Sequence, residues 1–209
     1  MPPLACITCG PAYEPIDAVR RITNFATGEI GSLLAEAFLR AGFDVVCFRG
    51  VGATWPPHPE ADVRAFSTND SLARGLRGLD RQPGIILHAA ALCDFVVESI
   101  EGSDGAAKLD SRSGPVRLTL APAAKVLPEI RKWFPGTLIV GWKYELDGTR
   151  ELALSRAARQ IQEAGSDACV VNGAAYGAGF GLVLAAGGTV HFPDKPALAR
   201  RLVAMVRGV

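Results

Sequence analysis

Short continuous apolar runs alternate with amphipathic helical patterns along almost the whole chain. Such runs are typical of strands buried on both faces, because a strand with one wet face alternates polar and apolar residues. Six segments are predicted as strands: Leu4–Cys9, Phe43–Phe48, Ile85–Ala91, Val116–Leu120, Leu138–Trp142 and Ala168–Val171. Strands of this kind that are separated by helices predict a parallel sheet with helices on both of its faces.

The helical pattern is clearest after the first strand, where one apolar stripe recurs at helical spacing and Gly42 closes it. The residues of the stripe are Ile30, Leu33, Leu34, Ala37, Phe38 and Ala41. Further helices are predicted at Asp70–Leu79, Ala124–Trp133, Thr149–Ala164 and Lys195–Val206. Near the end, Gly181–Ala185 and Thr189–Phe192 flank Ala-Gly-Gly, which predicts a β-hairpin. The fold class is therefore α/β, a three-layer sandwich with a mostly parallel sheet and a C-terminal hairpin.

The chain has 209 residues, of which 49% are apolar and 21% are charged, and its net charge is +1. These values predict one domain over residues 1–209 with a sizeable core. The balanced charge does not favour nucleic acid or an acidic membrane surface as a partner. The N-terminal segment lacks the pattern of a signal peptide, and no apolar run is long enough for a membrane span, so we expect a cytoplasmic protein.

Five cysteines are present: Cys6, Cys9, Cys47, Cys93 and Cys169. Cys6 and Cys9 form a C-x-x-C, but positions three apart on a strand point to opposite faces. Buried reduced thiols are therefore the better interpretation, and no protein-built metal site is expected.

Two connecting segments are predicted to be mobile, namely Gly50–Glu60 and Glu98–Pro115. The second is long for a compact domain and is rich in Gly, Ser and Asp. Such segments often act as lids or binding loops.

The connection between the first strand and the first helix is also long. About seventeen residues separate Gly10 from a helix that is expected to begin near Thr27-Gly28, and Arg20, Arg21 and Asn24 precede that helix. The start of a helix offers free N–H groups and positive dipole charge, to which arginines add. The segment is therefore suited to an anionic ligand. The alternative is that Arg20 and Arg21 only pair with Glu14 or Asp17 on the surface.

In an open parallel sheet, ligands bind outside the carboxyl ends of the strands. The residues predicted there are Gly10, His88–Asp94, Trp142–Glu145 and Asn172–Gly173. Each of these positions also has a purely structural interpretation. Asp94 and Asn172 are suited to turns, and His88 to packing inside the fold.

No P-loop, no Y-x-x-x-K pair, no G-x-S-x-G elbow and no His/Cys metal cluster occurs in the sequence. The glycine run Gly177-Ala178-Gly179-Phe180-Gly181 precedes the hairpin and not a helix, so it favours a flexible turn over a phosphate site.

The stretch ITCGPAYEPIDAVRRITNFATGEIG closely resembles the opening motif of the phosphopantothenoylcysteine synthetases. These phosphopantothenate–cysteine ligases form the C-terminal domain of the DNA/pantothenate metabolism flavoprotein family. Further landmarks follow in the family's order, namely AALCDF, AAKLDS, PAAKVLPEI, VGWKYE and DACVVNG. The resemblance spans nearly the whole chain. From the resemblance we expect a divergent, stand-alone member without the flavin-dependent decarboxylase half that often precedes this domain in bacteria.

The resemblance implies a homodimer with a Rossmann-like fold, for which the hairpin at about 180–193 is a candidate dimerisation element. It implies an enzyme that joins 4′-phosphopantothenate to cysteine, with CTP or ATP as co-substrate and with Mg²⁺. A separate phosphopantothenoylcysteine decarboxylase is a possible partner.

The resemblance also implies residue roles. Asn24, Arg20 and Lys108 match residues that handle the acyl-nucleotide or serve the activation step. Positions that match the family's binding site for substrate and nucleotide are Gly10, Thr27, Gly28, Ala90, Ala91, Asp94, Trp142, Lys143 and Asn172. By spacing alone, Lys108 is a solvated surface lysine.

The chain also departs from the family pattern. The lysine-rich loop has become Lys108-Leu109-Asp110-Ser111, and the Thr-Arg of the first motif is Ala12-Tyr13. Two lysines that face the triphosphate in the family correspond to Gln160 and Ala164. Three phosphates need several cationic donors. Lys125, Lys143 and Arg159 are the nearby candidates.

Three functions remain open from the sequence. The first is the ligase, and the second is a non-catalytic binding protein for a nucleotide or pantothenate derivative on the same scaffold. The third is a Rossmann oxidoreductase, which the missing glycine fingerprint disfavours.

Overall fold

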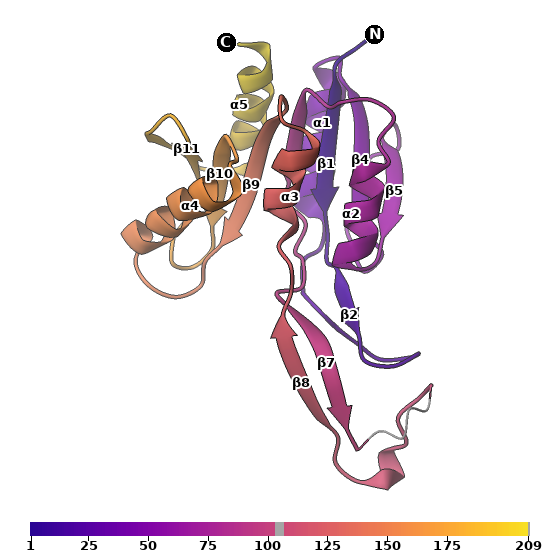
Figure 1. Ribbon diagram of the computed structural model, residues 1–209. Helices are drawn as coiled ribbons and strands as arrows, with labels where there is room; N and C mark the ends of the chain where they lie inside the picture. The colour runs from indigo at the N-terminus through magenta and orange to yellow at the C-terminus, as the bar shows by residue number, and fades with distance from the viewer. Residues whose placement is uncertain (103–106, 209) are drawn as a thin grey trace.

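The computed structural model describes residues 1–102 and 107–208, which are built around an eight-stranded sheet (Figure 1). The order of its strands is β12-β11-β10-β9-β6-β1-β4-β5. The bounds are β1 Leu4–Cys9, β4 Asp44–Gly50, β5 Asp62–Phe66, β6 Ile85–His88, β9 Leu138–Tyr144, β10 Ala168–Asn172, β11 Phe180–Leu184 and β12 Thr189–Phe192. The six strands from β10 to β5 pair in parallel, and β11 and β12 form the antiparallel hairpin. The predicted α/β fold with a mostly parallel sheet is confirmed.

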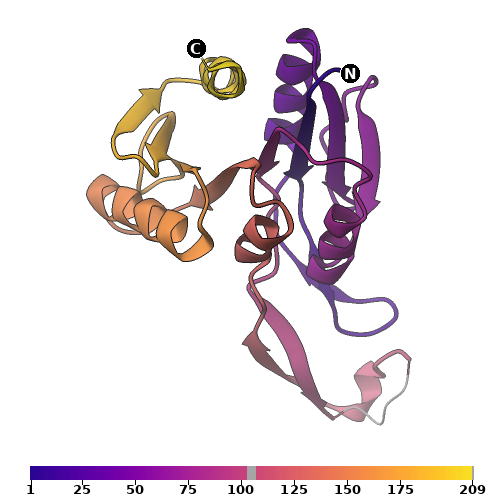
Figure 2. The same cartoon turned by 45° about the horizontal axis from the view of Figure 1, so that its top comes forward.

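Helices cover both faces of this sheet. Their bounds are α1 Glu29–Arg40, α2 Asn69–Arg77, α3 Val126–Trp133, α4 Arg150–Ala164 and α5 Lys195–Arg207. Helices α1 and α5 pack on the face that carries Ile7 and Cys9, whereas α2 and α3 pack on the face that carries Cys6 and Ile86. Figure 2 shows α1 and α5 at the top of the view, with α5 seen end-on. Cys6 and Cys9 belong to different core clusters, as the strand geometry predicts.

The chain starts at β1 in the middle of the sheet, adds β4 and β5 on one side, and then returns to add β6 on the other side. The connections after β1 and β6 therefore leave in opposite directions. This is a topological switch point, where an open parallel sheet forms a crevice at its carboxyl edge. Short parallel pairing continues beyond the two strands, because Pro11 bridges Ala91.

The segment Val116–Leu120, predicted as a strand of the central sheet, lies elsewhere. Strand β8, Arg117–Pro122, pairs with β7, Phe95–Glu101, in a separate antiparallel ribbon that projects from the body of the molecule (Figure 1). We call this ribbon the β7–β8 arm. Apart from a contact between β7 and β2, its two strands contact mainly each other, so its apolar residues lie on the faces of a two-stranded ribbon and not inside the central sheet. Part of the predicted loop Glu98–Pro115 is thus strand, and residues 103–106 lie outside the described residues.

The other predicted mobile segment, Gly50–Glu60, is held at several points. The Arg49 guanidinium donates to the carbonyls of Ala53 and Trp55 at 2.6 and 2.7 Å. The Ser32 hydroxyl donates to the carbonyl of Pro56 at 2.7 Å. Ala53 also packs closely against Gly10 and Gly28, which both have φ near +80°. A Cβ added at Gly10 or Gly28 would lie 2.7 or 3.0 Å from the Ala53 Cβ. The first part of this loop is therefore fastened to the body of the molecule by hydrogen bonds and close packing.

The long connection after β1 also contains structure that the sequence did not reveal. Strands β2, Tyr13–Pro15, and β3, Arg21–Thr23, form a small antiparallel hairpin. Beyond it, α1 begins at Glu29 with Gly28 as its N-cap, close to the predicted start at Thr27-Gly28.

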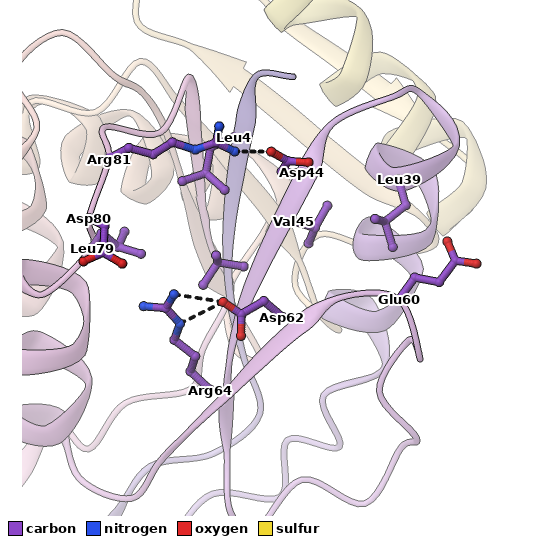
Figure 3. Close-up of a pocket in the computed structure, with 11 residues that line it drawn as sticks. Leu4, Leu39, Asp44, Val45, Glu60, Asp62, Arg64, Leu79, Asp80 and Arg81 are labelled. Carbon is purple, nitrogen blue, oxygen red and sulfur yellow. Dashed lines mark hydrogen bonds and ion pairs between the residues drawn. The ribbon is translucent and has the colours of Figure 1, made fainter. Parts of the chain in front are cut away.

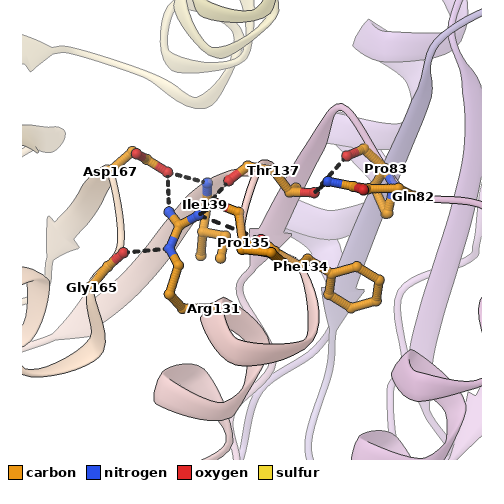
Figure 4. Close-up of polar contacts among 9 residues, drawn as sticks. All are labelled: Gln82, Pro83, Arg131, Phe134, Pro135, Thr137, Ile139, Gly165 and Asp167. Atoms are coloured by element: carbon orange, nitrogen blue, oxygen red, sulfur yellow. Dashed lines mark hydrogen bonds and ion pairs between the residues drawn. The ribbon is translucent and has the colours of Figure 1, made fainter.

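Arg131 on α3 ties together several elements at the other edge of the sheet (Figure 4). It donates to the carbonyls of Gly165, Pro135 and Thr137 at 2.7 to 3.0 Å, and it forms an ion pair with Asp167 at 2.6 Å. Asp167 also accepts the N–H of Ile139 at 2.7 Å. One guanidinium thus joins the end of α4 to the connection between α3 and β9.

No helix in the described parts of the chain is long and apolar enough to cross a membrane.

Candidate functional site

The main candidate site is a pocket of about 880 Å³ at the carboxyl edge of the sheet, beside the switch point. Its lining comes from the ends of β1, β6, β9 and β10, from the first turns of α1 and α3, from α4 and from the start of α5. The predicted residues among the lining are Gly10, Asn24, Thr27, Gly28, Ala90, Ala91, Asp94, Trp142, Lys143 and Asn172. The volume lies within the range of small-molecule and cofactor sites.

Asn24 holds one wall of the pocket in place. Its side-chain amide donates to the carbonyls of Ala91 and Leu92 at 3.1 and 3.2 Å. These bonds fasten the segment that precedes α1 to the segment that follows β6. Asn24 therefore has a structural task in addition to its place in the lining.

Two further predicted residues differ in whether their polar side chains have a partner. Asp94 forms an ion pair with Lys125, the N-cap residue of α3. Asn172, at the end of β10, has its Oδ1 buried without a hydrogen-bond partner among the described residues. A buried polar atom of this kind is costly unless a ligand or water satisfies it. This supports a binding role for Asn172 over a plain turn.

Five cationic side chains line the pocket: Lys125, Lys143, Arg156, Arg159 and Lys195. Arg156 and Lys143 share the buried carboxylate of Glu145, with Lys143 at 3.6 Å. Arg159 pairs with Glu163 at 3.7 Å, and Lys195 pairs with Glu29 at 2.5 Å. The pocket therefore combines several cations with fewer carboxylates, and it suits an anionic ligand.

Arg156 and Lys195 were not predicted from the sequence. Arg156 precedes Gln160 by four residues and so lies on the same face of α4, a signal that helical spacing offered. Lys195 begins α5, far from the other residues in sequence, and no pattern announced it.

The positions that replace the family's lysines do line the pocket, but they add no charge. The Gln160 amide donates to the Trp142 carbonyl and contacts the Cys169 sulfur, both at 3.3 Å. Ala164 lies in the lining close to the end of α4.

Arg20 and Lys108 are not found among the described residues that line the pocket. Arg20 forms an ion pair with Asp17 in the turn between β2 and β3, as the alternative interpretation predicted, and it donates to the Leu109 carbonyl at 3.3 Å. The N–H of Leu109 donates to the Asp17 carboxylate at 3.1 Å. Lys108, which is exposed, therefore lies next to this turn. Arg21 lies over the ring of Tyr13, at 4.7 Å from its centre.

Two opposing effects act on the pKa of the Asp17 carboxyl. Burial raises the pKa, but hydrogen bonds lower it by more, to about 2. The donors are the backbone N–H groups of Val19, Leu109 and Arg20 and the Arg20 guanidinium. Asp17 is therefore ionised at neutral pH, and it connects the turn to the segment that carries Lys108.

His88 also lines the pocket, although only 7% of its surface is exposed. Burial lowers its pKa to about 4, so the imidazole is neutral at physiological pH. Its Nδ1 lies 2.8 Å from the hydroxyl oxygen of Thr8.

A second hollow of about 410 Å³ lies at the opposite, amino edge of the strands (Figure 3). Its two arginines are already engaged, because Arg81 pairs with Asp44 and Arg64 pairs with Asp62 at 2.8 Å. It lies away from the switch point and is the weaker candidate. In the described ranges, no three His, Cys, Asp or Glu side chains are grouped so as to hold a metal ion.

The chain is similar to known proteins over most of its length. The family of the DNA/pantothenate metabolism flavoprotein C-terminal domain matches residues 4–206. The coenzyme A biosynthesis bifunctional protein CoaBC of Methanocaldococcus jannaschii is 31% identical over 163 residues, which are 78% of this chain and 38% of that protein. Phosphopantothenate–cysteine ligase 2 of Oryza sativa is 25% identical over 81% of this chain and 67% of its own length.

A solved structure shows the same fold. The DNA/pantothenate metabolism flavoprotein of Streptococcus pneumoniae superposes with a TM-score of 0.84 over 98% of both chains, at 21% identity. The chain spans half or less of the length of the bifunctional CoaBC relatives that it matches.

Proposed function

Since the chain belongs to the family of DNA/pantothenate metabolism flavoprotein C-terminal domains, we propose that it is a phosphopantothenate–cysteine ligase of coenzyme A biosynthesis. The observation that carries the proposal is the pocket at the switch point. It brings Asn24, Asp94 and Asn172 together with five cationic side chains. The relatives' names, CoaBC and phosphopantothenate–cysteine ligase, support the same pathway.

The proposed reaction has two steps. The carboxylate of 4′-phosphopantothenate attacks the α-phosphate of CTP or ATP and displaces pyrophosphate, which leaves a mixed acyl-phosphate anhydride. The amine of cysteine then attacks the acyl carbon, an amide forms, and the nucleoside monophosphate leaves with the electron pair of the broken C–O bond. Both steps gain from alignment and from neutralisation of phosphate charge, and need little side-chain chemistry.

The pocket residues suit these tasks. Arg156 and Lys143, held by the Glu145 carboxylate, offer N–H donors to phosphate oxygens. Asn24 and the segment Ala90–Ala91 line the pocket, and the family resemblance implies that they contact the acyl-nucleotide and the nucleotide. We propose Asn24, Arg20 and Lys108 as catalytic residues, the last two because of the family resemblance alone.

Mg²⁺ fits this site only as an ion that arrives with the nucleotide. The pocket carboxylates of Glu29, Asp94 and Glu163 each already face a cation. Mg²⁺ commonly binds one or two carboxylates together with phosphates and waters, so the nucleotide would supply most of its ligands.

The direct test is turnover. The purified chain is incubated with 4′-phosphopantothenate, cysteine, Mg²⁺ and either CTP or ATP, and pyrophosphate release and product mass are followed. Product with one nucleotide supports the ligase and identifies the nucleotide. A folded protein without turnover with either nucleotide refutes the ligase.

A non-catalytic binding protein is the second candidate, and one observation favours it. Lys108 lies beside the β2–β3 turn and outside the lining of its own chain's pocket. Nucleotide binding in calorimetry without any turnover would support this candidate.

For the ligase, Lys108→Ala abolishes turnover, whereas the matched Lys132→Ala on α3 preserves it. Product that passes to a phosphopantothenoylcysteine decarboxylase would place the two proteins in sequence.

A further inference from the structure

Thr8 and His88 form a buried pair beside the pocket, and His88 is the member of the pair that lines it. They are register partners on the neighbouring strands β1 and β6 and lie at the carboxyl ends of both. Thr8 is fully buried, and its hydroxyl oxygen lies 2.8 Å from His88 Nδ1. The backbone N–H of Ala90 donates to the same hydroxyl oxygen at 3.3 Å.

This arrangement fixes where the protons lie. The Thr8 hydroxyl oxygen already accepts a hydrogen bond from the N–H of Ala90. The hydroxyl must also donate its own hydrogen bond to an acceptor, because a buried donor without a partner is costly. Among the described residues the acceptor in reach is His88 Nδ1. In a neutral imidazole, an Nδ1 that accepts a hydrogen bond carries no proton of its own, so the ring proton belongs to Nε2.

The other ring nitrogen remains available to a ligand. His88 Nε2 makes no hydrogen bond with any described residue, and His88 belongs to the pocket lining together with Ala89 and Ala90. The floor of the pocket thus presents one N–H donor that carries no charge and has a fixed orientation.

We infer that His88 is a specificity-determining residue, whose Nε2–H donates a hydrogen bond to an oxygen acceptor of the ligand bound at the ends of β1 and β6. Thr8 is the positioning residue that holds the imidazole in this tautomer. The site favours a carbonyl, carboxylate or phosphate oxygen. It rejects an amino or ammonium group there, because two donors would face each other.

The inference rests on the proposed function only for the choice of probes, which are CTP, ATP and 4′-phosphopantothenate, each tested alone. Isothermal titration calorimetry compares the wild type with His88→Leu and Thr8→Val. We expect His88→Leu to raise the Kd of at least one probe about tenfold or more, the usual effect of a lost buried hydrogen bond. His58→Leu is the matched control, because His58 lies in the loop before β5 and outside the pocket lining.

Thr8→Val separates the role of the tautomer from the mere presence of the ring. It keeps the shape of the side chain and removes the hydroxyl, so the imidazole is free to take either tautomer. We expect a smaller loss of affinity for the same probe, even though the histidine is still present. A purely structural role for His88 would leave the probe's Kd unchanged in Thr8→Val.

NMR of the wild-type protein keeps the test independent of mutant folding. The ¹⁵N chemical shifts of the imidazole should show a protonated Nε2 and an unprotonated Nδ1 at pH 7, and the Nε2–H signal should shift when the probe saturates the protein. Either of two results overturns the inference. One is a protonated Nδ1, and the other is no shift together with a Kd within twofold of wild type in His88→Leu.

The two proposals fail in different ways. Probe binding that weakens in His88→Leu supports the inference even if the turnover assay finds no ligase activity. Turnover that is unchanged in His88→Leu, together with unchanged affinities, refutes the inference and leaves the ligase standing. Wild-type protein that binds none of the three probes refutes both.

Discussion

Asp17 links two segments far apart in the sequence, the β2–β3 turn and the residues around Lys108. Its pKa is about 2, whereas an ordinary aspartate has 3.8, so ionised Asp17 stabilises the contact fully above about pH 4. The stabilisation is lost as the pH falls from about 4 towards 2, because the folded state must then take up the proton. We expect the Leu109 amide to exchange faster with solvent over this window, as measured by NMR.

Asp17→Asn serves as the control, since it removes the charge at every pH. Faster exchange of the Leu109 amide is then expected already at neutral pH, without further change between pH 4 and 2. A wild-type amide that remains equally protected at pH 2 contradicts this role of Asp17.

His88 predicts a pH dependence of global stability with a definite sign. The unfolded chain protonates this histidine below about 6.5, whereas the folded chain resists protonation until about pH 4 because the ring is buried. Stability should therefore fall as the pH drops from 6.5 to 4, by roughly 3 kcal/mol from this residue alone. Urea unfolding of wild type and His88→Leu across this range measures the difference.

The difference in slope is the decisive quantity, because His88→Leu also changes packing at every pH. His58→Leu should retain the slope of the wild type. Equal slopes for wild type and His88→Leu would show that the folded protein protonates His88 without cost.

At the scale of elements, Arg131 joins α3, α4 and the start of β9 through one side chain (Figure 4). Arg131→Ala leaves several carbonyls and the Asp167 carboxylate without this donor. We expect a loss of about 2–4 kcal/mol in the free energy of unfolding. Arg131→Lys should recover only part of it, because an ammonium cannot reproduce the planar fork. Urea denaturation measures both variants.

Arg112→Ala is the matched control, since Arg112 forms an exposed ion pair with Asp110. Such pairs contribute little, so the change should stay within about 0.5 kcal/mol. An Arg131→Ala variant as stable as Arg112→Ala would show that the contacts in Figure 4 do not hold these elements together.

The elements that the sequence predicted well are those buried on both faces. The run Leu4–Cys9 was predicted with the bounds that β1 has, because every residue in it is buried. Strand β5 was missed, because only Phe66 of its five residues is buried and an edge strand has no continuous apolar run. Strand β8 was assigned to the wrong sheet, because Leu118 and Leu120 look the same in sequence whether they lie in a buried sheet or on the faces of an isolated ribbon.

The site was predicted as far as local motifs extend. Asp94 and Asn172 could be placed because the carboxyl edge of a parallel sheet collects the residues at the ends of its strands, and Asn24 because it precedes the first helix. Arg156 and Lys195 reach the pocket from helices whose tertiary placement no local pattern reveals. The Thr8–His88 pair depends on strand register, which the sequence left open.

At the scale of the whole molecule, the open question is the partner surface. The hairpin at about 180–193 was the predicted dimerisation element, and its edge strand β12 exposes Val190. The β7–β8 arm exposes more, because Phe95 is 52% and Leu120 is 41% exposed and both lie on the same face of the ribbon. An apolar face on a projecting ribbon is unusual without a partner.

We therefore expect a homodimer of 22.0 kDa chains that the combined change Phe95→Glu and Leu120→Glu converts into monomer. Size-exclusion chromatography with light scattering measures the mass, and circular dichroism shows that the fold is kept. Val190→Glu is the control for the hairpin. Loss of the dimer in Val190→Glu alone would assign the interface to the hairpin, and a monomeric wild type would refute the dimer.

The close contact of Gly10, Gly28 and Ala53 has a consequence for how this chain tolerates mutation. The three positions lie in separate loops, yet each limits the volume allowed at the other two, because an added methyl group at either glycine meets the Ala53 methyl. Their mutational effects should not add. In a library that randomises all three codons, clones that still produce folded protein should be enriched in combinations of small residues. A larger side chain at position 53 should be rare among them, even though Ala53 is not in the pocket lining. The shape of the binding edge is in this sense encoded jointly by three distant codons.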